Sequence, residues 1–301
     1  MALPRLHEIH PGSFDDLVIN QLDQVDPSPG IEALIAMGGG TVDQLLIATA
    51  YAEPKVKVTS RDTQTVLAGC NFGSGRSIET LAKLQYQLRQ NGGIYAGAGA
   101  HMTLTSTLGF LYIEEFGAKQ DDKEGADISC TYVPLFDGTN LPLVVNTNQS
   151  LTGAAAANSV HAMSKVIFEN SQLEGVQSFR VKSGLEVEIK RADGELYPRI
   201  CVIKKRAPTI EVECLNLGII STLTLGGTYP ITNGLAAYLQ RVVAGGGRYA
   251  ANTNNHISAR ATAGSYKVES LSGSKGDNTM VKITAMQTGG PLTIATATTI
   301  P

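Results

Sequence analysis

The stretch AGCNFGSGRSIETLAKLQYQL, residues 68–88, has the residue types of a phosphate-binding loop, a glycine-rich turn followed by apolar residues at helical spacing. A Walker-type loop needs a glycine five residues before its Gly-Lys-Ser/Thr, because backbone N–H groups wrap the phosphates and the lysine reaches them. Counted back from Gly75, that position is Cys70, and Arg76 replaces the lysine. The spacing therefore favours a structural turn leading into a helix that Ser77 caps.

Two other motifs share parts of this turn. Residues 71–75 are similar to the Asn-Phe-Gly turn in the swivel domain of aconitase-like dehydratases. The similarity ends at Arg76, where that family has serine, and at Ile78, where it has arginine. A dinucleotide fingerprint fails as well, because Ile78 stands where a third glycine is needed. We expect neither a nucleotide nor a dehydratase site here.

The other residues capable of catalysis or metal binding form no recognised motif. They are His7, His10, His101, His161 and His256, and Cys70, Cys130, Cys201 and Cys214. No Cys-x-x-Cys is present, so we expect reduced cysteines in the core. His101 and His256 could form a symmetric metal or base pair, but neither has an acidic or cysteine partner at useful spacing. We expect each to be a polar residue at the start of a strand, and the chain to have no catalytic residue, metal site or cofactor.

Charge also argues against two kinds of site. The acidic run KQDDKEGAD, residues 119–127, lacks the alternating ligands of a calcium loop, so we expect a solvated hairpin tip or an interaction loop. The basic triplet at residues 204–206 is too short to indicate nucleic-acid binding, and the net charge is −3.

The composition indicates a β-rich protein with a sizeable core. The chain has 301 residues, 43% of them hydrophobic, only 17% charged, and no Trp. Many Gly, Thr and Ala residues suit short strands and turns better than a helical bundle. The length allows one large or two ordinary domains. The amino terminus has no signal-peptide pattern and no apolar run approaches membrane-spanning length, so we expect a soluble protein made in the cytoplasm.

The two halves of the sequence align with each other, which indicates a tandem repeat of one domain. Residues 30–58 align with residues 184–212 at an offset of 154, the distance from Gly30 to Gly184. After one inserted residue, His101 aligns with His256, and farther along Cys130 aligns with Ile283. Identities are sparse, but the matches stay collinear along nearly the whole chain. We therefore predict a tandem duplication with one domain at residues 1–151 and a second at residues 152–301.

Each copy is predicted to be mainly β, as a sandwich or barrel-forming domain with one flanking helix. Alternating runs predict strands at residues 55–60, 102–109, 127–133 and 141–147, and at their partners in the second copy, among them 209–214. Hairpin turns are expected at Asp137-Gly138 and Asp193-Gly194. Apolar spacing predicts helices at 77–90 and 233–244. The segment from Gly153 is either helical or a linker into a strand.

The charges differ between the two copies. Residues 1–151 hold 9 Lys and Arg against 17 Asp and Glu, a net charge of −8, whereas residues 152–301 hold 15 against 10, a net charge of +5. Unlike copies that alternate in a ring would attract each other, whereas like copies would repel. Ordinary sequence drift explains the difference almost as well.

In its small-residue strands, single helix per half, duplicated frame and lack of a catalytic motif, the chain resembles the tail-tube domain of long-tailed bacteriophages and related contractile injection machines. In that family, subunits pair strands edge to edge into a barrel whose bore passes DNA. The resemblance implies a structural protein of the virion tail rather than an enzyme. It also implies self-assembly into trimeric rings of pseudo-sixfold symmetry, contacts with other tail proteins and no membrane, with double-stranded DNA passing through without specific binding.

The resemblance leads to one structural expectation and leaves alternatives open. The barrel-forming strands are expected among those that begin near Lys55, His101 and Ile128, and near Thr209, His256 and Val281. A tail-tip hub or tube-completion protein would share the duplicated domain and differ in copy number. A capsid-decorating or receptor-binding β-protein would form spikes rather than rings. An enzyme with a duplicated fold would need polar groups that converge in one cleft.

Overall fold

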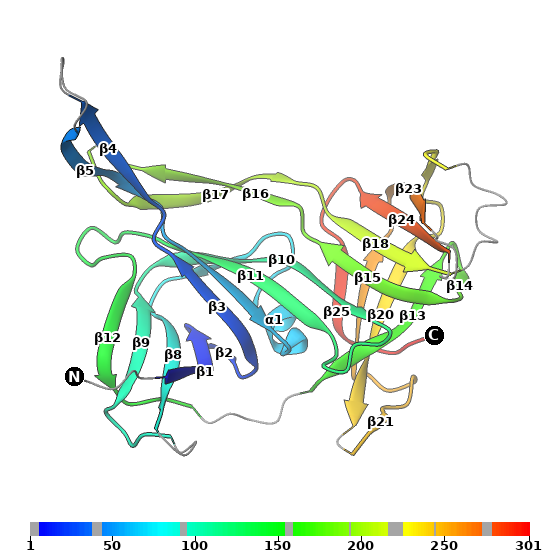
Figure 1. The fold of residues 1–301 in the computed structure, drawn as a ribbon. Coiled ribbons are helices and arrows are strands. Elements are labelled where there is room, and N and C mark those ends of the chain that lie inside the picture. The colour runs from blue at the N-terminus through cyan, green and yellow to red at the C-terminus, as the bar shows by residue number, and fades with distance from the viewer. Residues whose placement is uncertain are drawn as a thin grey trace.

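The computed structural model describes residues 6–37, 44–90, 95–153, 159–192, 194–215, 225–243, 245–272 and 279–301. The first half contains β1 (Leu6–Phe14), β2 (Leu17–Ile19), β3 (Leu22–Ser28), β4 (Ile31–Met37), β5 (Gln44–Ala52), β6 (Lys55–Ser60), α1 (Thr63–Gly69), β7 (Arg76–Ile78), β8 (Ala82–Arg89), β9 (His101–Ser106), β10 (Gly109–Lys119), β11 (Asp127–Pro134) and β12 (Val144–Gln149). The second half contains β13 (His161–Phe168), β14 (Ser171–Leu173), β15 (Val176–Lys182), β16 (Leu185–Arg191), β17 (Pro198–Arg206), β18 (Thr209–Cys214), β19 (Thr228–Pro230), β20 (Leu235–Val243), β21 (Gly247–Arg248), β22 (His256–Ala261), β23 (Gly264–Ser272), β24 (Met280–Gln287) and β25 (Thr293–Thr298). The mainly β fold class is confirmed, and the strands are antiparallel (Figure 1).

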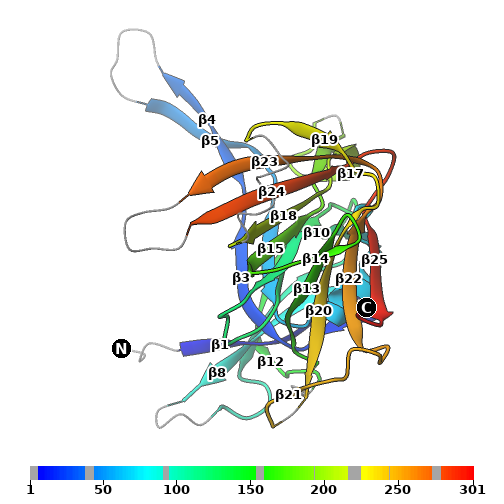
Figure 2. The same cartoon turned by 90° about the vertical axis from the view of Figure 1, so that its right-hand side faces the viewer.

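The two halves pair their strands in the same order. The first half has a sheet of order β12-β9-β8-β1-β2, and the second half has a sheet of order β25-β22-β20-β13-β14 with β21 beside β20. A shared ten-stranded sheet has the order β19-β23-β24-β18-β15-β10-β11-β6-β3, with β7 beside β10. Figure 2 shows the second half's β13, β20, β22 and β25 side by side, as a layer distinct from β15, β18, β23 and β24. None of these sheets closes into a barrel within the described segments.

Irregularities of the strands also recur at corresponding places. A register shift lies between Leu22 and Gln24 where β3 pairs with β6, and another lies between Val176 and Ser178 where β15 pairs with β18. After β3, the carbonyl of Gly30 accepts the N–H of Glu53 at 2.9 Å. After β15, the carbonyl of Gly184 accepts the N–H of Ala207 at 3.0 Å. Both glycines have positive φ, 54° and 56°, where other residues are strained.

The expected boundary at residue 151 falls between β12 and β13. The two halves are nevertheless tightly connected. The ten-stranded sheet takes strands from both, and one hydrophobic core extends from Phe14 in the first half to Leu292 in the second.

Both predicted helices are wrong. Residues 77–90 contain β7 and β8, and residues 233–244 contain β20, so Ser77 lies in a strand and caps no helix. The sequence AKLQYQLR of β8 alternates apolar and polar residues, and its apolar members lie four apart as well as two apart. Both periods therefore fit the same residues, and sheet packing decides between them. The helix that does form, α1, lies earlier, so the glycine-rich turn connects a helix to a strand.

The remaining local expectations have mixed outcomes. Gly194 lies in the hairpin between β16 and β17 with φ of 75°, whereas Asp193 lies outside the described residues. Asp137-Gly138 is a turn but not a hairpin, because β11 and β12 belong to different sheets. The segment from Gly153 leads into strand β13, although residues 154–158 lie outside the described part of the chain.

The strands expected to form a barrel are divided between sheets. β6, β11, β18 and β24 lie in the shared sheet, whereas β9 and β22, which begin at His101 and His256, lie in the smaller sheets. Among the described residues, no helix is long and apolar enough to cross a lipid bilayer.

Candidate functional site: the strand joint and the open sheet edges

The two halves are joined by direct pairing of β10 with β15. Phe116 lies opposite Val181 and Ala118 lies opposite Phe179, and each of these side chains is at most 1% exposed. The pairing continues beyond the strands, because Ser183 donates its N–H to the carbonyl of Glu114 at 2.9 Å. We call this contact the internal joint. It combines a continuous hydrogen-bond ladder with a dry apolar face, as neighbouring strands of one domain do.

A glycine at the centre of the internal joint allows an ion pair to cross β10. Gly117 lies opposite both Arg180 of β15 and Asp127 of β11. A Cβ at Gly117 would lie 2.8 Å from the Cδ of Arg180 and 2.2 Å from the carbonyl oxygen of Phe179. The guanidinium of Arg180 reaches Asp127, with Nη1 and Oδ1 2.7 Å apart. A basic residue of the second half thus meets an acidic residue of the first.

The β16–β17 hairpin makes a second attachment. Figure 1 shows it extending from the second half toward the base of β5 in the first half. At its tip, the carbonyl of Leu196 accepts the N–H of Ala52 at 2.9 Å, and the Arg191 guanidinium lies 4.0 Å from the centre of the Tyr51 ring. The corresponding β4–β5 hairpin of the first half extends away from the body in both overall views (Figures 1 and 2).

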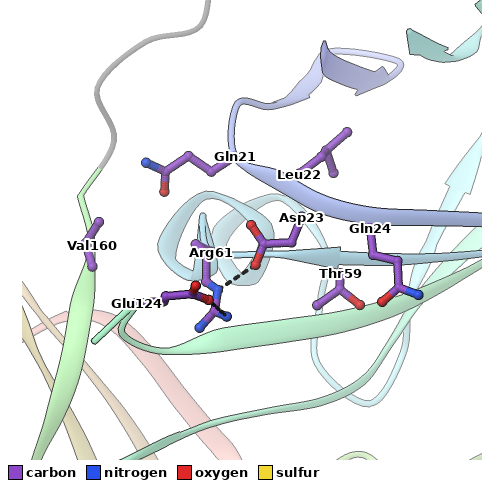
Figure 3. Close-up of a pocket in the computed structure, with 8 residues that line it drawn as sticks. All are labelled: Gln21, Leu22, Asp23, Gln24, Thr59, Arg61, Glu124 and Val160. Carbon is purple, nitrogen blue, oxygen red and sulfur yellow. Dashed lines mark hydrogen bonds and ion pairs between the residues drawn. The ribbon is translucent and has the colours of Figure 1, made fainter. Parts of the chain in front are cut away.

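The acidic run at residues 119–127 forms the tip of the β10–β11 hairpin, one of the two expected structures. It is held by Arg61, directly after β6. Arg61 donates to Glu124 at 2.6 Å, to the carbonyl of Gly125 at 2.8 Å, and to Asp23 of β3 at 2.5 Å. Figure 3 shows Asp23 and Glu124 pointing toward the Arg61 guanidinium. Arg61 therefore links the hairpin tip to β3 in the same half of the chain.

The hairpin tip also contacts the second half. Ala126 donates its N–H to the carbonyl of His161 at 2.6 Å, and Gln120 donates to the carbonyl of Gln177 at 2.7 Å. The acidic run is thus part of the connection between the halves.

The shared sheet ends in two open edges, which correspond to the two sides of the internal joint. β3 occupies the place in the first half that β15 occupies in the second, and the end of β23 occupies the place of β10. The outer edge of β3 pairs with no other described strand, and residues 269–272 of β23 pair with β24 on their inner side alone. Leu271 is 48% exposed on this edge.

The outer face of the shared sheet has acidic and basic residues in alternation. We call this set the charge row: Lys57, Glu114, Lys182, Glu211, Lys282 and Glu269, in order across the sheet. The Glu211 carboxylate lies 2.6 Å from Nζ of Lys182 and 3.0 Å from Nζ of Lys282. Burial opposes ionisation of Glu211, but these two ammonium groups outweigh it and hold its pKa below the ordinary value. Each charge in the row therefore has an opposite neighbour.

His101 and His256 begin strands β9 and β22, as expected. Nδ1 of His101 accepts the N–H of Leu88 at 3.1 Å, and Nδ1 of His256 accepts the N–H of Arg241 at 3.2 Å. Both rings are buried, with 4% and 0% exposure. They satisfy backbone groups in the neighbouring strand and do not come together as a pair.

The glycine-rich turn contains no free cationic group for a phosphate. Nη1 of Arg76 donates to the carbonyl of Gly69 at 3.0 Å, and its other nitrogen pairs with Asp16. Gly73 and Gly75 have positive φ of 82° and 68° and form the turn that follows α1. Arg76 thus stabilises this turn.

The cysteines are thiols, and three of the four are buried, namely Cys70, Cys130 and Cys214. Burial raises the pKa of Cys70 to about 12 and raises that of Cys130 as well, which makes both poor nucleophiles. In the described part of the chain, no three His, Cys, Asp or Glu side chains cluster as metal ligands would.

Two acidic residues that no sequence motif marks hold corresponding turns in the two halves. Asp15, with φ of 54°, accepts the N–H groups of Glu79, Thr80 and Leu81 at 3.0, 3.0 and 2.8 Å. In the second half, Glu169 has φ of 48° and accepts from residues 232 and 233 in the same way. The sequence does contain a sign of this pair. Asp15 and Glu169 are 154 residues apart, the offset of the aligned repeats, and each directly follows a phenylalanine, Phe14 or Phe168.

A comparison with protein-family models finds no match, and neither does a comparison with curated protein sequences.

Proposed function

We propose that this protein is a structural subunit of a bacteriophage tail tube, and that its two halves arose by duplication of one domain. Three chains would form a ring of six similar halves, and stacked rings would form a conduit for DNA. The observation that carries the proposal is the internal joint, at which two halves of equal strand order share one sheet while the corresponding edges remain open.

Self-assembly follows from the position of these edges. The second half offers β15 to β10 of the first half. By the same arrangement, the first half offers β3 to β23 of another chain. Such a contact joins two different surfaces, so repeated addition closes a ring or continues as a filament. Ring closure would also remove exposed edges, which in an isolated chain favour aggregation.

The charge row supports the choice of a conduit for DNA. The inner face of the shared sheet packs against the hydrophobic core, and the charge row lies on its outer face. The β16–β17 hairpin covers part of that outer face, where Leu185 and Val187 pack against the cluster of Tyr112, Val133 and Leu135. On that face the Glu211 carboxylate lies between the ammonium groups of Lys182 and Lys282. Paired charges give little net attraction for phosphates, which would allow DNA to move through.

Negative-stain electron microscopy of the purified protein tests the proposal. We expect rings or short tubes with threefold or pseudo-sixfold symmetry and a central hole wide enough for duplex DNA. A protein that stays monomeric at high concentration, and whose images show compact particles without a hole, would refute it.

A further inference from the structure

The two sides of the internal joint can be compared with the open edges residue by residue. β3 pairs with β6 as β15 pairs with β18, including the register shift near the start of each strand. This places Ser28 at the position of Lys182, Pro27 at that of Val181, and Pro29 at that of Ser183. The open edge of β3 therefore carries two prolines that the internal joint does not have.

At the positions of both prolines, the backbone N–H of any other residue would point away from β6, toward the open edge. Because the carbonyl of Gly30 accepts the N–H of Glu53, alternation along the strand directs the hydrogen bonds of Ser28 toward β6. The positions of Pro27 and Pro29 then face the open side. In the internal joint the residue in the place of Pro29 is Ser183, and its N–H donates to Glu114. Proline has no N–H, so the edge of β3 lacks two donors.

The other edge keeps the features of the internal joint. The pairing of β23 with β24 shifts register between Val268 and Ser270, as that of β10 with β11 shifts between Ile113 and Glu115. Ser270 therefore corresponds to Glu115, and Leu271 corresponds to Phe116. Leu271 is thus an apolar side chain at the position where the internal joint buries Phe116.

We propose that residues 269–272 of β23 pair with β3 of a second copy of this chain, with Leu271 opposite Pro27 and Ser270 opposite Ser28. Pro27 and Pro29 make this external joint weaker than the internal one, because the carbonyls of Leu271 and Glu269 receive no donor from them. Single chains consequently stay apart until their concentration is high. The inference rests on the proposed self-assembly. It adds the register in which β23 and β3 pair between chains and the reason that this contact is weak.

Restoring the two backbone N–H donors tests whether Pro27 and Pro29 weaken the contact between chains. The double variant Pro27→Val, Pro29→Ser gives β3 the residues of β15. Analytical ultracentrifugation across a concentration series should show self-association at least about 10-fold tighter than that of the wild type, since each restored hydrogen bond adds a factor of several. Ser28→Val is the matched control, because it raises the β-propensity of the same strand without adding a donor. Equal association of the double variant and the wild type, or an equal gain in the control, would overturn the role of the prolines.

A disulfide tests the register. Lys182 and Glu115 form a pair without mutual backbone hydrogen bonds, because the Ser183–Glu114 bond fixes the alternation. Such pairs bring Cα atoms to about 4.5 Å, which suits a disulfide. A Ser28→Cys, Ser270→Cys variant should form intermolecular cross-links under mild oxidation, visible on a non-reducing gel. The control pair Gln24→Cys, Ser270→Cys is four residues out of register and should remain uncross-linked.

The two tests separate the register from the assembly. Rings in the microscope without a Ser28→Cys, Ser270→Cys cross-link would overturn the proposed register while the tube function stands. A cross-link in the expected register without rings would support the joint and count against the tube function.

Discussion

Leu271 and Phe116 occupy corresponding positions in the two halves, yet Leu271 is 48% exposed and Phe116 is 1% exposed. Phe116 lies opposite Val181 of β15, and its ring packs edge-on against Phe72, with the ring centroids 5.6 Å apart. At Leu271 the described part of the chain supplies no equivalent strand. The two positions therefore differ in whether a neighbouring strand lies beside them.

Replacement of these two side chains should separate folding from assembly. Leu271→Ser should change the free energy of unfolding of the single chain by less than about 0.5 kcal/mol, because the side chain is largely exposed. The same variant should lose rings. Phe116→Ala should destabilise the chain by about 3–5 kcal/mol, because it leaves a cavity in a packed core. Chemical denaturation followed by electron microscopy measures both, and rings of unchanged yield from Leu271→Ser would contradict the assignment of this edge.

Gly117 should be intolerant of any side chain. A Cβ there would lie 2.2 Å from the Phe179 carbonyl oxygen and would displace the Arg180 side chain from Asp127. We expect Gly117→Ala to lower the free energy of unfolding by about 1–3 kcal/mol. Gly97→Ala is the control, because no atom lies within 4 Å of its added Cβ. Equal stability of the two variants in urea titrations would show that the sheet accommodates a side chain at Gly117 and would contradict the prediction.

The strands were predictable where burial alternates along the chain. KVKVTS and TIEVEC became β6 and β18 because Val56, Val58, Ile210 and Val212 face the core and their neighbours face water. The short helix α1 was not predictable, because seven residues hold too few turns for helical spacing to show.

The candidate site was the least predictable part. Val25 on β3 and Phe179 on β15 are both buried apolar residues of alternating strands. Their local sequences do not show that β3 is an open edge and that β15 forms the internal joint. Pairing between strands far apart in sequence depends on the whole sheet. Arg180 of the second half pairs with Asp127 of the first, but the net charges of the two halves do not single out either residue.

The stability of the fold should decrease in mild acid because of His161. This ring is fully buried, and burial lowers its pKa to about 4 from an ordinary value of 6.5, against the opposing effect of the Asn255 and Ser159 carbonyls. Between these two pH values the unfolded chain binds a proton that the folded chain excludes. The free energy of unfolding should therefore fall from pH 6.5 toward pH 4, by up to roughly 3 kcal/mol in total.

Urea titrations at several pH values measure this effect, and His161→Gln identifies its source. The variant should show a flatter dependence on pH between 6.5 and 4 than the wild type. An NMR titration of the His161 ring supplies an independent check, because its signals should remain those of neutral imidazole at pH 5. A ring that is protonated at that pH would contradict the prediction.

The charge row should determine how the protein treats DNA. The wild type should not retain duplex DNA at physiological salt, because each lysine of the row has an acidic neighbour. Glu211→Lys combined with Glu269→Lys would leave Lys182, Lys282 and the new lysines without compensation. We expect this variant to bind DNA with a slope of log affinity against log salt of about −3.6, because four lysines can then contact phosphates. Glu79→Lys combined with Glu174→Lys makes the same change in net charge at exposed positions outside the row, and it should bind more weakly in the same filter-binding assay. Equal binding by the two double variants would show that net charge alone governs the interaction and that the row does not face the DNA.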